Sequence, residues 1–180
     1  MGRGSVNMLQ EKNVNQVFKE RIDILEGAPV FENCIFEKGV YIEGNNKRYF
    51  HEGVVPHPVF KSCKFRSQGS VPSVALWTRA QGDFIDCQMS AESYVPVRID
   101  TGSHGVFRDC SVSYNFDRCG VAIMIAASGD FENCRFCNFG ERGSATKIEP
   151  VYFDAHDKEK TRFENCLFSE TAKNSENNCP

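Results

Sequence analysis

Apolar and polar positions alternate in short runs along most of this chain, and one such run occurs six times. It is first seen as VFENCIF at 30–36, with the form Phe-x-x-Cys-x-Phe. Related strings follow as VFKSCKF (59–65), DFIDCQM (83–89), VFRDCSV (106–112), DFENCRF (130–136) and RFENCLF (162–168). A string that returns at a near-constant interval predicts a repeat architecture in which each copy forms one structural unit.

The unit is about 23 residues long in the middle of the chain, where the repeated Cys stands at 63, 87, 110 and 134. Each unit also holds a second apolar run with a period of two, which is typical of a β-strand. The gaps between runs contain Gly, Ser, Asn and Pro and no helical period, so we expect short parallel strands that stack coil on coil about 4.8 Å apart. The second runs are Val40-Tyr41-Ile42, Val74-Ala75-Leu76, Val97-Arg98-Ile99, Ile123-Met124-Ile125 and Val151-Tyr152-Phe153.

A small polar residue precedes every repeated Cys, and such residues tolerate the left-handed conformation of a sharp bend. They are Asn33, Ser62, Asp86, Asp109, Asn133 and Asn165. Together with the unit length and the apolar columns, this polar column resembles the right-handed parallel β-helix repeats of the pectin-lyase-like superfamily over residues 20–170. The resemblance implies an all-β solenoid of about six coils and is almost silent on activity, because the fold serves enzymes, tailspikes, adhesins and interaction domains alike. A four-sided pentapeptide-repeat helix stays open as a rival, although its pattern would have to run through every face.

The chain divides into a tail with a capping helix (1–20), the β-helix (21–170) and a polar tail (171–180). Val14, Val17 and Phe18 share one face of a helix drawn over residues 8–19, and an amphipathic helix there would cover the first coil. The polar tail offers no obvious cover, so we expect the far end to be capped by another chain, by a removed segment, or by nothing better than this tail. Insertions at 43–58 and 137–150 project from the body as loops.

Composition narrows the classes of partner. The chain has 180 residues, 41% of them hydrophobic, a formal net charge of −3 and a pI near 5.8, so a nucleic-acid partner is not expected. No apolar run suggests a signal peptide or a membrane span. Six of the nine Cys occupy one repeat position, which favours reduced core thiols, and hence the cytoplasm or a host-cell interior, over a disulfide framework. Neither a cofactor nor a metal is expected, because His51 and His57 lie in an insertion without a metal-ligand spacing.

Candidate chemistry lies on the second strand of each unit. If Val97 and Ile99 point inward, Arg98 and Asp100 point outward, because a strand alternates its faces. Aromatic rings beside carboxylates and a guanidinium suit a binding groove, although a mixed polar stripe is also the ordinary solvated face of a strand. The same register places on the stripe Asp23, Tyr41, Glu43, Ala75, Trp77, Arg98, Asp100, Met124, Ala126, Tyr152 and Asp154, of which Tyr41, Trp77, Arg98, Asp100, Tyr152 and Asp154 are the predicted binding residues.

Three functions fit this reading. The leading hypothesis is a non-enzymatic binding or scaffold protein, for instance an effector or a phage-type inhibitor, that presents the stripe to a partner protein or a glycan. The alternative is a small polysaccharide lyase or glycoside hydrolase with Asp100 and Asp154 as acid and base, about 9–10 Å apart by strand spacing. Against it, the motifs of the family's enzymes occur only as fragments in the wrong order. The third is a structural module of a phage tail fibre or similar assembly, which would form an oligomer such as a trimer through its uncovered end or a solenoid face.

Overall fold

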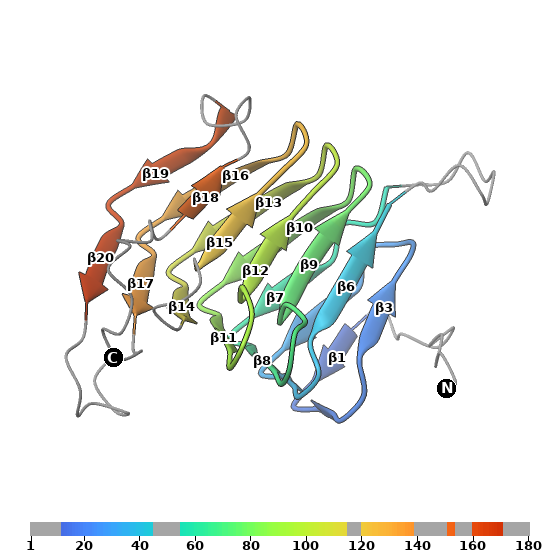
Figure 1. The fold of residues 1–180 in the computed structure, drawn as a ribbon. Coiled ribbons are helices and arrows are strands. Elements are labelled where there is room, and N and C mark those ends of the chain that lie inside the picture. The colour runs from blue at the N-terminus through green and yellow to red at the C-terminus, as the bar shows by residue number, and fades with distance from the viewer. Residues whose placement is uncertain (1–11, 45–54, 115–119, 139–150, 154–159, 171–180) are drawn as a thin grey trace.

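The chain winds into a parallel β-helix. The computed structural model describes residues 12–44, 55–114, 120–138, 151–153 and 160–170. Twenty strands in these ranges form three sheets, A, B and C, and all their pairings are parallel. The chain visits the sheets in turn, so that each coil adds one strand to each sheet (Figure 1). The predicted parallel β-helix is therefore confirmed, and three sheets in the described residues are incompatible with the four-sided rival.

Among the described residues, six coils have all three strands, and a seventh contributes strands to sheets A and B. Sheet A contains β1 (Lys12–Val14), β4 (Val30–Glu32), β7 (Val59–Lys61), β10 (Gln81–Ile85), β13 (His104–Arg108), β16 (Ser128–Glu132) and β19 (Arg162–Glu164). Sheet B contains β2 (Val17–Phe18), β5 (Ile35–Phe36), β8 (Lys64–Ser67), β11 (Gln88–Ala91), β14 (Ser111–Tyr114), β17 (Arg135–Asn138) and β20 (Leu167–Glu170). Sheet C contains β3 (Ile22–Ile24), β6 (Val40–Glu43), β9 (Val74–Trp77), β12 (Val97–Ile99), β15 (Val121–Ile123) and β18 (Val151–Phe153).

The polar column makes the bend between sheets A and B. Asn33 and its equivalents have φ between 51° and 55°, as the sequence predicts for a left-handed corner. Their side chains are exposed and bond from coil to coil, for example Ser62 Oγ to Asp86 Oδ2 at 2.8 Å. The ladder thus lies on the outside of the corner, while the apolar columns fill the inside.

Stacked phenyl rings form the centre of the core. The inward residue of sheet A is Phe in six consecutive coils, and neighbouring rings lie nearly parallel with centroids 4.7–5.0 Å apart. An inward glycine precedes several of these rings by two residues and makes room for them; a Cβ at Gly105 would lie 2.5 Å from Cε2 of Phe107. The rings of this column belong to Phe31, Phe60, Phe84, Phe107, Phe131 and Phe163.

The predicted capping helix over residues 8–19 is wrong for the part that the structure describes. Residues 12–18 instead form β1 and β2 of a first coil. The described residues contain no helix with the length and apolar composition that a membrane span requires. Asn15 takes the left-handed bend with φ 54°, and Phe18 stacks on Phe36 at 4.8 Å. KNVNQVF is therefore a degenerate copy of the repeat, with Asn13 in place of the Phe and Gln16 in place of the Cys. Pairing with the second coil decides the conformation, because it satisfies the backbone and partly buries the Phe18 ring.

The fifth strand of sheet C is also displaced from its predicted position. It comprises Val121–Ile123, and Met124 lies level with Asp100, not with Arg98. Ile125, which we expected to point inward, has φ 53° and is 55% exposed at a corner. The shift is two residues, so the inward and outward faces are unchanged and Met124 still faces outward.

Candidate functional site

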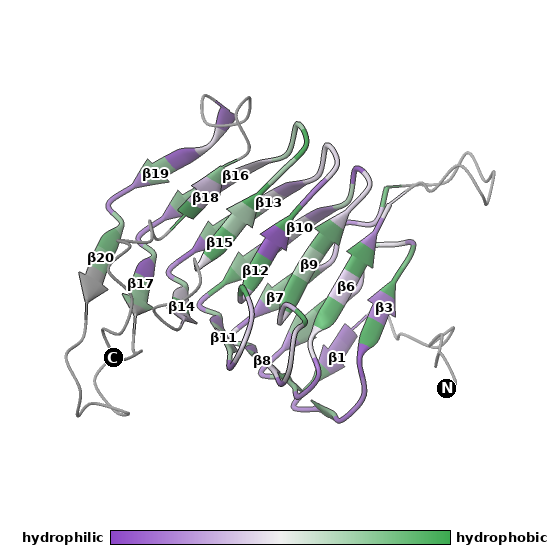
Figure 2. Ribbon diagram, in the orientation of Figure 1, coloured by the Kyte–Doolittle hydropathy of each residue, from purple (hydrophilic) through white to green (hydrophobic). Residues whose placement is uncertain are grey.

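The outer face of sheet C carries the predicted stripe. The strand register aligns the outward residues Asp23, Tyr41, Ala75, Arg98, Ala122 and Tyr152 in one row across six coils. A second row pairs Glu43 with Trp77. Figure 2 shows the strands of this sheet largely in green, with β12, which carries Arg98, purple over part of its length. Asp154 lies outside the described residues.

Arg98 is the centre of the polar contacts on this face. Its guanidinium carbon lies 4.5 Å from the centroid of the Trp77 ring, a cation–π distance. Its Nε and Nη2 donate to Asp100 Oδ2 at 3.2 and 2.7 Å, and Nη1 donates to Tyr94 Oη at 3.1 Å. Burial works to lower the pKa of Arg98, but the hydrogen bonds to Asp100 and Tyr94 raise it on balance. We call Trp77, Tyr94, Arg98 and Asp100 the Arg98 cluster.

Asp100 is buried and accepts the hydrogen bonds of Arg98 in this cluster. Only 1% of Asp100 is exposed, and its second oxygen accepts from Thr101 Oγ1 at 3.1 Å. Both carboxylate oxygens therefore have donors within the chain, and the side chain orients Arg98. A general acid or base needs an oxygen that reaches substrate. The arrangement gives no support to Asp100 as a catalytic group, and the Asp100–Asp154 pair stays a prediction.

A second cluster of the same design lies at the start of the sheet. Arg21 stacks on Tyr41 at 4.5 Å from the ring centroid and contacts Asp23, with Nε 2.8 Å from Oδ1 and Nη2 2.9 Å from Oδ2. The hydrogen bond with Asp23 raises the pKa of Arg21. The sequence analysis missed Arg21, although the tripeptide Arg-Ile-Asp occurs at both 21–23 and 98–100. On a strand, this spacing sets a guanidinium and a carboxylate on one face.

The two clusters leave different amounts of aromatic surface accessible. Tyr41 and Trp77 are half-buried beneath their guanidinium partners, and the Trp77 Nε1 atom is buried without a hydrogen-bond partner within the described part. Tyr152 at the other end is 52% exposed. Tyr94 and Val95 lie between β11 and β12. They pack on Ala122 and so cover part of the outer face of sheet C. The stripe is thus an ordered and partly covered surface.

Another group of polar side chains, which the sequence analysis did not predict, lies on the outer face of sheet A. His104 Nδ1 is 2.8 Å from Ser128 Oγ, and its Nε2 is 3.6 Å from Asp130 Oδ2. This connectivity is that of a nucleophile, a base and an orienting acid. However, the N–H of Ser128 donates to Ser103 O and that of Gly129 to a Thr161 hydroxyl, so these two amides are not available to stabilise an oxyanion. We interpret the group as a surface network.

His57 belongs to the same face. Its Nε2 lies 3.1 Å from Asp83 Oδ1, which repeats the His104–Asp130 contact two coils earlier. His51 lies outside the described residues. Within the described part, no group of three or more His, Cys, Asp and Glu side chains could hold a metal ion.

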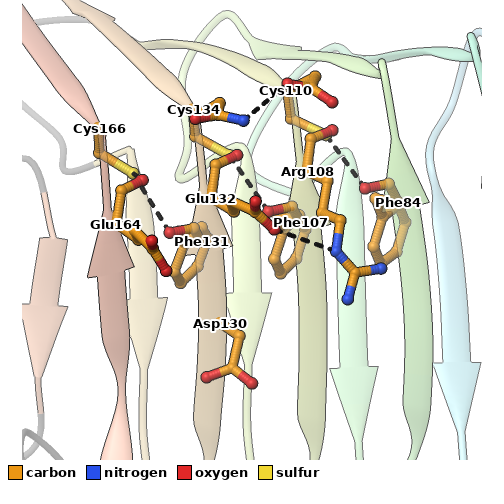
Figure 3. Close-up of polar contacts among 12 residues, drawn as sticks. Phe84, Phe107, Arg108, Cys110, Asp130, Phe131, Glu132, Cys134, Glu164 and Cys166 are labelled. Carbon is orange, nitrogen blue, oxygen red and sulfur yellow. Dashed lines mark hydrogen bonds and ion pairs between the residues drawn. The ribbon is translucent and has the colours of Figure 1, made fainter.

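The repeated cysteines form an interior column of free thiols. Each donates to the carbonyl of the Phe, or of Asn13, in the preceding coil, for example Cys110 to Phe84 O at 3.3 Å (Figure 3). Burial raises the pKa of Cys110, so the thiol remains protonated and acts as a donor. Cys137 lies outside the column and is disulfide-bonded, so the expectation of reduced thiols holds for the column alone. The column contains Cys34, Cys63, Cys87, Cys110, Cys134 and Cys166.

Comparisons with known proteins add little. No protein-family model matches the sequence, and no curated protein does. Among solved structures, a candidate glycosyl hydrolase from Parabacteroides merdae ATCC 43184 is 10% identical, with 82% of each chain covered and a TM-score of 0.28. QnrB1, a plasmid-mediated fluoroquinolone resistance protein, is 12% identical, with 88% of this chain and 89% of that chain covered and a TM-score of 0.18. At these TM-scores neither likeness carries an argument about function.

Proposed function

We propose that the protein is a non-enzymatic binding protein that holds a partner protein against the outer face of sheet C. The observation that supports this most is the Arg98 cluster. Trp, Tyr and Arg are the residues that most often dominate the energy of a protein interface. Arg98 is held by Trp77, Tyr94 and Asp100 before any partner arrives, so less side-chain entropy is lost on binding.

The geometry favours a protein partner over a glycan. A sugar ring needs an open aromatic face, and a guanidinium already covers one face of Trp77 and of Tyr41. A protein surface can instead contact the outer edges of these stacks together with Tyr152. The strands of sheet C pair in register, so each coil presents an outward side chain at the same position. Such a row of side chains suits an extended contact.

The test compares Trp77→Ala and Arg98→Ala with the wild type and with Arg66→Ala. Arg66 is exposed on β8 of sheet B, so its variant is the matched control. Each protein is immobilised and exposed to lysate of the native cell, and the retained proteins are quantified by mass spectrometry. We expect one partner that the wild type and Arg66→Ala retain, and that Trp77→Ala and Arg98→Ala bind about 30-fold more weakly, as loss of an interface hot spot implies.

Other outcomes would change the assignment. A partner retained equally by all four proteins would remove sheet C as the binding face. If the wild type binds a sugar on a glycan array and Trp77→Ala abolishes this binding, the ligand is a glycan and not a protein. If the wild type releases reducing sugars from a polysaccharide and Asp100→Asn abolishes this release, the protein is an enzyme. Circular dichroism of each variant confirms that the fold is intact.

A further inference from the structure

The phenyl columns of the solenoid continue into its last described coil, where their rings are partly exposed. Phe163 and Phe168 continue the columns of Phe131 and Phe136 and stack on them, with ring centroids 4.9 and 4.8 Å apart. Phe163 is 36% exposed and Phe168 50%, whereas Phe131 and Phe136 are 1% and 0% exposed. Core surface is thus accessible at this end, which is typical of a protein–protein contact.

The first coil differs from the last. Of its inward residues, Asn13, Ile22 and Ile24 are 3%, 4% and 1% exposed, and Phe18 is partly buried. Among the described residues, the phenyl rings that are exposed by a third or more therefore lie in the C-terminal coil. This asymmetry favours contacts that join like ends.

The outermost strand of sheet A is complementary to itself. β19 reads Arg162-Phe163-Glu164, and β16 is its one neighbour among the described strands. A second copy laid antiparallel to it, with Phe163 opposite Phe163, sets each Arg162 opposite the Glu164 of the other copy. Opposite charges directly across an antiparallel pair are stabilising, and a surface that pairs with itself in this way defines a two-fold axis.

Head-to-tail stacking is disfavoured by the same residues. If the register of sheet A continued onto β1 of another copy, Arg162 would lie opposite Lys12 and Phe163 opposite Asn13. This pairing sets two positive charges together and a phenyl ring against an amide side chain. Charges on an edge strand commonly prevent sheet extension. Here the charges of Arg162 and Glu164 disfavour the parallel pairing with β1 of another copy and favour the antiparallel pairing of two β19 strands.

We infer that two copies of this chain associate end to end through their last coils, with antiparallel β19 strands across a two-fold axis at Phe163. The contact buries Phe163 and the neighbouring Phe168 ring and pairs Arg162 with Glu164 twice. It does not involve the outer face of sheet C, so it is independent of the proposed function. Sedimentation equilibrium of the full chain over a wide concentration range is the direct test, because a dimer doubles the mass of 20.3 kDa.

Charge exchange identifies the interface. Arg162→Glu places like charges at both symmetry-related contacts, and we expect it to raise the dissociation constant about tenfold or more. Glu164→Arg should do the same. The double variant Arg162→Glu/Glu164→Arg restores opposite charges at both contacts and should return the dissociation constant to near the wild-type value.

Controls separate this contact from a general loss of structure. Arg108→Glu breaks an exposed ion pair with Glu132 on the same sheet within the body and should leave dimerisation unchanged. Trp77→Ala should also dimerise normally. A wild-type chain that stays monomeric at all concentrations, a trimer mass, or a double variant as weak as Arg162→Glu would each overturn the inference.

Discussion

Removal of one phenyl ring from the middle of the sheet A column tests the stacked interior directly. Phe84 is fully buried, with Phe60 and Phe107 stacked on its two sides at 5.0 and 4.7 Å and Phe65 edge-on at 5.8 Å. Phe84→Ala removes the buried area and leaves a cavity that two rigid neighbours cannot close. Substitutions of this kind cost about 3–5 kcal/mol. Because both ring faces lose a partner, we expect about 4 kcal/mol.

The matched control is Phe18→Ala in the first coil. Phe18 is half-buried and, among the described residues, has one stacked neighbour, Phe36, with Phe31 edge-on. One stacked face and partial exposure reduce the expected loss to about 2 kcal/mol. The difference between the two variants follows from position in the stack, since the residue type and the substitution are the same.

The assay is equilibrium unfolding in urea, followed by far-ultraviolet circular dichroism and by the fluorescence of Trp77. Coincidence of the two curves is needed for a single free energy of unfolding, because coils can unfold separately in a solenoid. A Phe84→Ala loss equal to or smaller than that of Phe18→Ala would refute the reasoning. It would mean that the interior rings do not gain from neighbours on both sides.

Three further predictions concern individual positions. Gly105→Ala places a Cβ 2.5 Å from the Phe107 ring and should destabilise the fold by about 1–3 kcal/mol, measured by urea unfolding, with partial recovery in combination with Phe107→Leu. Because burial raises the pKa of Cys110, iodoacetamide should label it at mildly alkaline pH only when urea unfolds the chain, and rapid labelling of the native protein would contradict a closed column. The hydrogen bond from Lys12 lowers the pKa of Glu32, so the stability that this group contributes is present at neutral pH and is lost as the pH falls below its ordinary value of about 4.5; Glu32→Gln should therefore reduce the loss of stability on acidification.

The sequence predicted the coil well because its signals are local. A small polar residue before each Cys tolerates the left-handed corner better than most residues do, and alternation with period two sets the inward and outward faces of a strand. The same two rules are sufficient to place Tyr41, Trp77 and Arg98 on the outer face of sheet C. They also place Met124 there, although the strand that precedes it is shifted by two residues.

The start of the first coil, residues 12–18, was predicted wrongly because its local signals point to another structure. Val14, Val17 and Phe18 have helical spacing, and Asn13 and Gln16 disguise the repeat. Only pairing of Lys12–Val14 with Val30–Glu32 shows that this segment is a strand. Long-range pairing overrode a weak local preference, as commonly happens when a helix has little to support it alone.

The amino-acid sequence alone determined the winding of the chain and the division of its strands into inner and outer faces, because both depend on side chains within a few residues of one another. The tertiary structure decided which outer residues meet: it set Arg98 over Trp77, Arg21 over Tyr41, and buried Asp100 beneath its two donors. These contacts depend on the register between coils joined by loops of unequal length, and on segments that fold back over the sheet. No local pattern contains that information, because the stacked coils place side by side residues that are about 20 positions apart in the chain.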